Sequence, residues 1–171
     1  MTATVVSVRS YTHAITHVTN NVMRSLKDVI RLSGLDPTKF VVDDWDSTEI
    51  ALQTWIESGH LEKITLEVFD PRTSKPLAFW DVGISYGYSG GDGSFWVDTD
   101  AIRYAIQKAG VHPSSADYRV IVTWNRNPNR PHVDGWSPTT ARSRDGFIVQ
   151  HIGTTVEASG LSGSLAYLRK P

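Results

Sequence analysis

The sequence contains no cysteine among its 171 residues, and neither charge sign is in marked excess. Without thiols, disulfide frameworks, thiolate zinc sites and thiol catalysis are excluded. No segment reaches the roughly 18 consecutive apolar residues that a membrane-spanning helix needs. Lys and Arg number 17 against 18 Asp and Glu, so the chain lacks the basic excess of a strong, non-specific nucleic-acid binder.

The first residues carry no recognisable targeting signal. Met1 to Val8 mix Thr, Ser and Val without a preceding basic stretch, and Arg9 interrupts the run. This segment is too short and too polar for the core of a signal peptide, so we expect a cytoplasmic protein without a membrane anchor. The chain length predicts one domain, and 40% hydrophobic with 20% charged residues is typical of a globular one.

Three segments have helical character. From Ser10 to Ser33, apolar residues recur at steps of three and four, and Gly34 is placed to end the helix; these residues are Tyr11, Ile15, Val18, Val22, Leu26 and Val29. A second helix is predicted from Asp46 to Ser58. Asp46 and Glu49 would form its capping box, and Trp45 would pack on Ile50. A third, short helix should end at Ala109.

Alternating residues predict strands in the rest of the chain. Ile64 to Phe69 and Leu77 to Tyr88 should form a hairpin, with Thr65 and Glu67 on the solvent face of the first strand. Further strands are predicted over 118–124, 147–152 and 165–168. Because helices and strands come in clusters, the fold class is α+β with a largely antiparallel sheet.

The stretch from Arg126 to Gly146 has no periodicity, and it contains three prolines and four arginines. A structureless segment of this length in a domain is usually either disordered or functional. Apolar residues follow it, so we expect a mobile segment whose far end docks again on the body of the protein. Trp136 stands in polar surroundings and is a candidate anchor onto another surface.

Candidate catalytic and ligand-binding patterns are weak. Gly87 to Gly91 matches G-x-S-x-G with Ser89 as nucleophile, but no helix can begin directly after it. His13 and His17 could face one metal ion, yet no third ligand is evident. Asp92, Asp98 and Asp100 lack the spacing of a calcium loop. We expect no metal, no cofactor and no enzyme activity, and the residues predict a binding module.

Two other functions stay open at this stage. A small serine hydrolase would use Ser89. A nucleic-acid-binding module would use the arginines of the irregular stretch, which are Arg126, Arg130, Arg142 and Arg144.

Several segments resemble bacterial HORMA domain proteins encoded in CBASS-type antiphage operons, which signal through cyclic oligonucleotides. The resemblance covers the whole chain and rests on non-catalytic motifs: Ser10 to His13, Ser25 to Ile30, Leu32 to Pro37, Asp92 to Trp96, Gly146, and Thr154 to Glu157. It implies a HORMA-like fold, with helices packed on an antiparallel sheet and a C-terminal safety belt that wraps a short closure-motif peptide.

The resemblance also implies boundaries and partners. Residues 10–124 would form the HORMA core and 125–171 the safety belt. The closed, peptide-bound form would bind and activate a CD-NTase-type nucleotidyltransferase. An AAA+ ATPase remodeller would grip the tail at 1–9, through Thr2, Ala3, Thr4 and Val5, and reopen the domain. A second HORMA protein is a further partner implied by the family.

For the peptide site, we expect an extended peptide to add to the edge of the strand from Leu77 to Tyr86, under the belt. The predicted peptide-binding residues come from that strand and from the safety belt at 125–171: Trp80, Val82, Ile84, Tyr86, Trp136, Phe147 and Val149.

Overall fold

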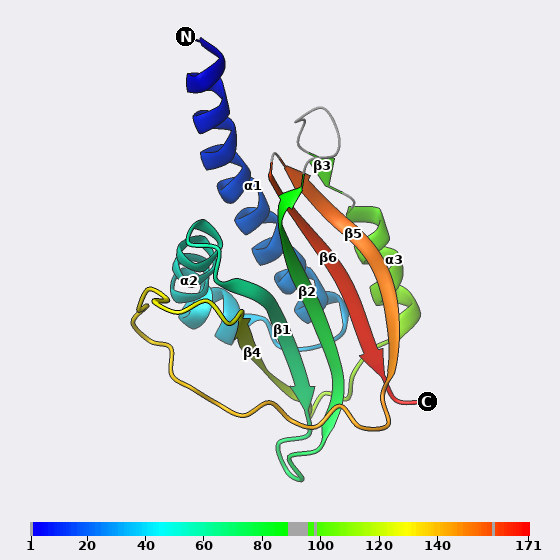
Figure 1. The fold of residues 1–171 in the computed structure, drawn as a ribbon. Coiled ribbons are helices and arrows are strands. Elements are labelled where there is room, and N and C mark those ends of the chain that lie inside the picture. The colour runs from blue at the N-terminus through cyan, green and yellow to red at the C-terminus, as the bar shows by residue number, and fades with distance from the viewer. Residues whose placement is uncertain (1, 89–95, 98, 159) are drawn as a thin grey trace.

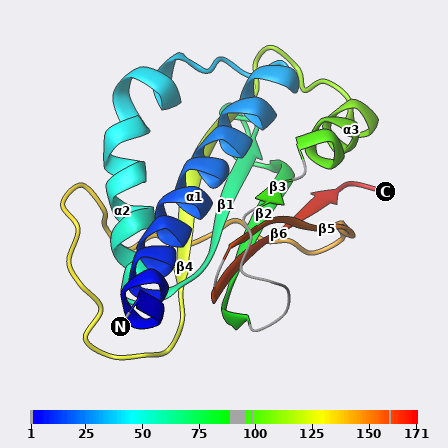
Figure 2. The ribbon, with the colours of Figure 1, turned by 90° about the horizontal axis from the view of Figure 1, so that it is seen from above.

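A computed structural model describes residues 2–88, 96–97, 99–158 and 160–171 of the chain. Within these residues the strands form one six-stranded antiparallel sheet, and helices cover one of its faces (Figures 1 and 2). The predicted α+β class with an antiparallel sheet is therefore confirmed.

Helix α1 (Thr2–Leu32) carries the predicted apolar stripe, and it ends where Gly34 adopts a positive φ of 87°. The helix begins earlier than the predicted start at Ser10. Residues 2–9 hold neither Gly nor Pro, so nothing in the sequence stops the helix from extending in that direction. The segment expected to be a tail is thus helical.

Helix α2 (Trp45–Glu57) begins differently from the prediction. A π-helical segment, η1 (Lys39–Asp44), leads directly into it, and the N-cap residue is Asp44 without a side-chain capping bond. The capping box at Asp46 is wrong for this reason. The packing of Trp45 on Ile50 is also wrong, because Ile50 is 55% exposed and the Trp45 ring packs on Phe40 at 5.5 Å.

The sheet has the order β3-β5-β6-β2-β1-β4. Strands β1 (Leu61–Phe69) and β2 (Pro76–Tyr88) form the predicted hairpin, and β4 (Asp117–Trp124) pairs with the other side of β1. Strands β5 (Ile148–Ala158) and β6 (Gly160–Arg169) are longer than predicted. Helix α3 (Thr99–Ala109) follows the short β3 (Trp96–Val97).

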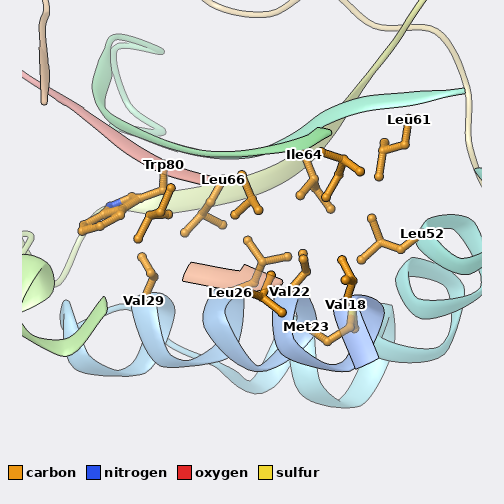
Figure 3. Packing of buried hydrophobic residues seen from close by; sticks show 14 of the residues in the cluster. Val18, Val22, Met23, Leu26, Val29, Leu52, Leu61, Ile64, Leu66 and Trp80 are labelled. Atoms are coloured by element: carbon orange, nitrogen blue, oxygen red, sulfur yellow. The ribbon is translucent and has the colours of Figure 1, made fainter. Parts of the chain in front are cut away.

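The main core lies between α1 and the sheet. Figure 3 shows Val22, Leu26 and Val29 of α1 pointing toward Leu66 of β1 and Trp80 of β2. All five side chains are at most 1% exposed. Burial of one such aliphatic side chain contributes about 1.5–3 kcal/mol, so this layer fixes α1 on the sheet.

The prediction that β2 is the strand that receives a peptide is wrong. Strand β2 lies between β1 and β6 and pairs with both along most of its length. Trp80, Val82 and Ile84 are buried in the helix-facing core. A strand whose two edges are both paired cannot accept a further strand.

Candidate functional site

The segment between β4 and β5, residues 125–147, is called the belt here. It has no helix or strand, as the sequence predicts. From the end of β4 it passes beside α2, runs back outside β4, and crosses the sheet to reach β5 (Figure 1). It therefore lies over the sheet face that the helices leave uncovered (Figure 2).

The first part of the belt is fixed to α2 and to the start of β1. The Asn125 side chain donates to the carbonyl of Gly59 at 2.6 Å, and His60 Nε2 donates to the carbonyl of Pro128 at 3.1 Å. The indole N–H of Trp55 donates to the carbonyl of Pro131 at 2.8 Å. The last two bonds satisfy carbonyls of a segment that forms no strand or helix hydrogen bonds of its own.

Trp136 fixes the middle of the belt. Its indole N–H donates to the carbonyl of Ser47 at 3.2 Å, and its ring packs edge-on against Trp55 at 5.7 Å. Trp124 also packs edge-on against Trp55, at 5.2 Å. The half-buried Trp136 thus anchors the belt to its own domain.

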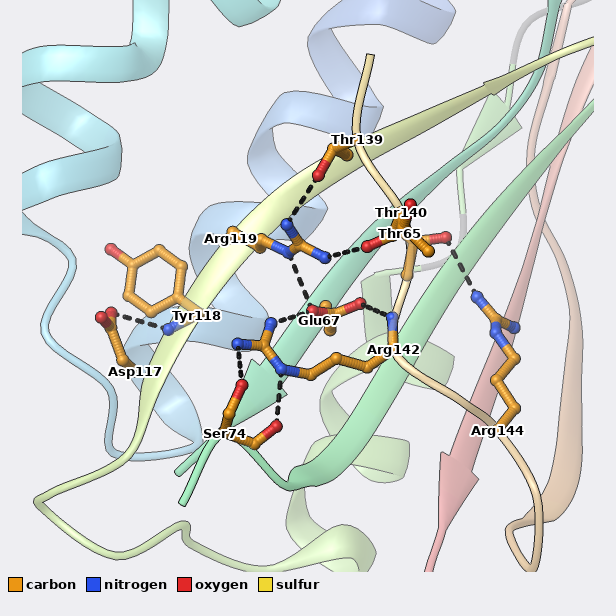
Figure 4. Close-up of polar contacts among 10 residues, drawn as sticks. All are labelled: Thr65, Glu67, Ser74, Asp117, Tyr118, Arg119, Thr139, Thr140, Arg142 and Arg144. Carbon is orange, nitrogen blue, oxygen red and sulfur yellow. Dashed lines mark hydrogen bonds and ion pairs between the residues drawn. The ribbon is translucent and has the colours of Figure 1, made fainter. Parts of the chain in front are cut away.

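The far part of the belt is held by a buried carboxylate. The Glu67 side chain is 0% exposed; Arg119 Nε donates to its Oε1 at 2.8 Å, and the backbone N–H of Arg142 donates to its Oε2 at 3.0 Å (Figure 4). The Arg142 guanidinium pairs with Glu67 and also bonds Ser74. Burial alone would raise the pKa of Glu67, but these donors outweigh it and hold the pKa below its ordinary value.

A second ion pair lies on the next strand. Arg144 binds Asp81 of β2, with Nη2 2.8 Å from Oδ1, and Thr65 donates to the same oxygen at 2.6 Å. Burial opposes the charge on Asp81, yet these bonds keep the pKa of Asp81 low. Beside this pair, Phe147 packs on the fully buried Phe79 at 5.2 Å. The belt thereby turns the predicted solvent face of the sheet into a second, partly polar interior.

These pairs account for two of the four belt arginines that the nucleic-acid hypothesis needs. Arg142 is paired with Glu67, and Arg144 with Asp81. Arg130 stacks on the Trp124 ring at 3.5 Å, and Arg126 is exposed. Two remaining cations do not form the basic stripe that phosphate binding requires.

A cavity of about 390 Å³ separates the belt from β4, and we call it the slot. Its β4 wall is the unbroken run Val120 to Trp124, and its belt wall holds Trp136, Ser137, Pro138, Thr139 and Ala141. Successive strand side chains point to opposite faces, so a wall of consecutive residues places the slot along the strand edge. Within the described residues, no strand pairs with this edge of β4.

The two ends of the slot differ. At the Arg119 end, the guanidinium donates to Thr139 Oγ1 at 3.0 Å and to the carbonyl of Thr140 at 2.7 Å, which ties the belt to β4. At the Trp124 end, the slot continues into a cavity of about 290 Å³ that shares Trp124 and Trp136 with it. Hydrogen bonds between β4 and the belt therefore close the slot at the Arg119 end, whereas at the Trp124 end the slot opens into a second cavity.

Of the predicted peptide-binding residues, Trp136 alone is among those that line the slot. Phe147 and Val149 lie at β5, which is separated from β4 by β6, β2 and β1. Tyr86 is half-buried and donates to the carbonyl of Leu61 at 2.7 Å. The residues of β4 were not predicted as part of the peptide site. The sequence indicated them only in that the irregular stretch follows directly after that strand.

The remaining chemical candidates gain no support. Ser89, Asp92 and Asp98 lie outside the described residues. His13 is exposed and His17 half-buried on α1, and the described residues contain no group of three or more His, Asp or Glu that could hold a metal ion. Among the described helices, none is long and apolar enough to cross a membrane.

Comparison with known proteins identifies the family. The model of bacterial HORMA domain 2 matches residues 3–171, and the chain belongs to this family. No curated protein matches the sequence. The resemblance inferred from the sequence motifs is therefore confirmed.

Solved structures share the fold at low sequence identity. A chain of a mitotic checkpoint complex has a TM-score of 0.70 at 9% identity, covering 92% of this chain and 98% of that one. C. elegans HTP-2 bound to the HIM-3 closure motif has a TM-score of 0.64 at 12% identity, covering 89% of each chain. A chain of the E. coli MS115-1 CdnC:HORMA-deltaN complex has a TM-score of 0.56 at 12% identity, covering 92% of this chain and 90% of that one. The HORMA-like fold is thus confirmed.

Proposed function

We propose that this chain is a non-catalytic signalling protein that encloses an extended closure-motif peptide in the slot between β4 and the belt. The observation that carries the proposal is the unpaired β4 edge, which faces a cavity under a segment tied down on both sides. An edge strand offers backbone N–H and C=O groups at alternate residues, and an extended peptide satisfies them by adding as a strand.

The dimensions of the slot suit a short strand. Val120 to Trp124 spans about 14 Å at roughly 3.4 Å per residue, which accommodates four or five peptide residues. The HTP-2 structure, which shares the fold, is described as bound to a closure motif, and this relationship supports the same ligand class here.

The proposed downstream partner is a CD-NTase-type nucleotidyltransferase of a CBASS-type antiphage system. Its activation by the peptide-bound form would start cyclic-oligonucleotide synthesis. The support is membership of the bacterial HORMA family together with a fold neighbour that was solved as a CdnC:HORMA complex. The test is reconstitution of this protein with a CD-NTase-type nucleotidyltransferase encoded beside it. Product formation should require both this protein and its peptide.

An AAA+ ATPase is the proposed remodeller, acting from the N-terminus through Thr2, Ala3, Thr4 and Val5. These residues belong to α1, so the ATPase would have to unwind the start of that helix. Removal of residues 1–8 should leave the melting temperature nearly unchanged and abolish ATPase-driven release of the peptide. Unfolding on truncation, or release that continues, would contradict this role.

The peptide site is tested by selecting binders from a phage-displayed library of random 12-residue peptides against the intact chain. Selected peptides are then measured by fluorescence anisotropy. Ala141→Phe places a bulky side chain on the exposed wall of the slot without removing any core contact, and it should weaken binding at least tenfold. Trp136→Ala removes the anchor and should have a similar effect.

Val149→Ala is the matched control. Val149 is 48% exposed on β5 and is absent from the residues that line the slot, so the affinity should not change. Selected peptides that bind all three variants equally would show that the slot is not the peptide site. Circular dichroism of each variant confirms that it is folded.

A further inference from the structure

The charges around the slot are distributed unevenly. The described residues that line the slot are all uncharged. At the Arg119 end, Arg119 and Arg142 share the Glu67 carboxylate, and their other guanidinium N–H groups donate to Thr139, Thr140 and Ser74. A charged side chain of a peptide lying along Val120 to Trp124 would lose its water in the slot and would find no partner of opposite charge there. Burying an uncompensated charge in this way is costly.

The Trp124 end has the opposite character. Arg130 and His132 line the adjoining cavity, and its described lining contains no Asp or Glu. His132 has a carboxylate nearby, with Asp134 at 3.0 Å. Among the described residues, Arg130 has no carboxylate partner, and its guanidinium lies 3.5 Å from the centroid of the Trp124 ring.

Stacking on Trp124 holds Arg130 at the end of the slot. A guanidinium on an indole face keeps its N–H groups at the rim of the plane free to bind a second group. Trp124 forms part of both the slot and the adjoining cavity, so a peptide that leaves the slot passes this guanidinium. The group that matches a guanidinium with two parallel N–H donors is a carboxylate.

We propose that the slot selects a peptide with an uncharged, apolar stretch of four or five residues followed, at the Trp124 end, by a carboxylate that binds Arg130. This inference rests on the peptide-binding function proposed above and adds the chemistry and the orientation of the ligand. The carboxylate comes from an Asp or Glu side chain or from the C-terminus of the peptide, and the single charged end fixes which way the peptide lies along β4.

The test repeats the library selection with three versions of the intact chain: unmodified, Arg130→Glu and Arg126→Glu. Arg126→Glu is the matched control, because it makes the same charge change at an exposed belt arginine that is absent from the residues lining either cavity. The unmodified chain and Arg126→Glu should select an apolar stretch with Asp or Glu at one constant end. Arg130→Glu should lose this preference or select Lys and Arg there.

Synthetic versions of one selected peptide then give magnitudes and separate the two sources of the carboxylate. Amidation of the C-terminus tests the terminal carboxylate, and Asp→Asn or Glu→Gln in the peptide tests the side chain. Loss of the responsible carboxylate should weaken binding about fivefold, since a partly exposed ion pair contributes about 1 kcal/mol. Loss of the same carboxylate should not further weaken peptide binding to the Arg130→Glu variant. Raising the salt concentration should reduce the difference in affinity between the peptides with and without the carboxylate.

The outcomes separate this inference from the proposed function. If Ala141→Phe weakens binding, the peptides bind in the slot. If such peptides show no preference for a carboxylate, or respond equally to Arg130→Glu and Arg126→Glu, only the inference about the carboxylate is overturned. Peptides that are indifferent to Ala141→Phe, or the selection of none, would overturn both.

Discussion

Replacement of Glu67 by Gln tests whether the carboxylate under the belt holds the belt on the sheet. The side chain is 0% exposed and accepts from Arg119 Nε at 2.8 Å, from the Arg142 backbone at 3.0 Å and from the Arg142 guanidinium. Gln keeps one acceptor oxygen, but its NH₂ group faces a donor, and the charge of both guanidinium groups is no longer compensated.

The magnitude follows from the exposure of the partners. Breaking a fully buried ion pair costs about 3–5 kcal/mol. Here the Arg119 and Arg142 side chains are 30% and 20% exposed, so water can solvate part of the released charge. We therefore expect Glu67→Gln to lower the free energy of unfolding by about 2–3 kcal/mol. At about 2–4 °C per kcal/mol for a chain of this size, the melting temperature should fall by roughly 5–10 °C.

Urea unfolding and amide hydrogen exchange together measure this effect. Exchange should increase most in the belt from Arg142 to Phe147, because the loss is local to its anchor. Glu62→Gln is the control, since it makes the same chemical change at an exposed position of the same strand. If the two variants lose equal stability, or if exchange increases in α1 rather than in the belt, the anchoring role of Glu67 is wrong.

The remaining predictions concern pH, packing and belt opening. The folded protein holds the pKa values of Glu67 and Asp81 below their ordinary values of 4.5 and 3.8, so the stabilisation by these carboxylates is fully present above the ordinary values. It is lost as the pH falls through the lowered pKa values of the folded state. The difference in melting temperature between the unmodified chain and Glu67→Gln should therefore shrink as the pH falls below 4.5. Gly163→Ala places a Cβ 2.8 Å from Val156 Cγ1 in the core and should cost about 1–3 kcal/mol in urea unfolding, whereas Gly83→Ala meets no atom within 4 Å and should change stability by less than about 0.5 kcal/mol. Without peptide, the belt amides at 132–137 should exchange faster than those at 142–147, because Trp136 is held by one neutral hydrogen bond and ring packing and Arg142 by a buried carboxylate. Equal rates would contradict this difference in anchoring.

The sequence predicted the fold well because its helices and strands follow local patterns. The stripe of α1 from Ile15 to Val29 and the alternation in β2 from Ala78 to Ile84 report which side chains are buried, and both sets lie in one core. The start of α2 could not be predicted, because the π-helical segment before it competes with the Asp46 cap through packing of Phe40 and Trp45. That competition depends on tertiary contacts, which a local pattern does not contain.

The site was harder to predict because it depends on the order of the strands. The length and aromatic content of β2 are equally consistent with an edge and a central position, and only the pairing of β6 beside it makes it central. Glu67 shows the same limit. Its alternation with Leu66 and Val68 predicts a solvent-facing carboxylate, but a belt that is far away in sequence covers that face.

The two anchors that flank the slot, Trp136 and Arg142, also indicate how the proposed peptide would enter it. The span between them, from Ser137 to Ala141, is too short to move far from β4 while both anchors hold, since five residues reach only about 17 Å. The Trp136 anchor consists of one neutral hydrogen bond and ring packing, whereas Arg142 is held by a buried carboxylate. A neutral hydrogen bond contributes about 1 kcal/mol, and bonds to charged groups about 1.5–3 kcal/mol each. The belt should therefore open first at its Trp136 end, where Arg130 lies, and the charged end of an incoming peptide would meet its partner before the apolar stretch reaches β4.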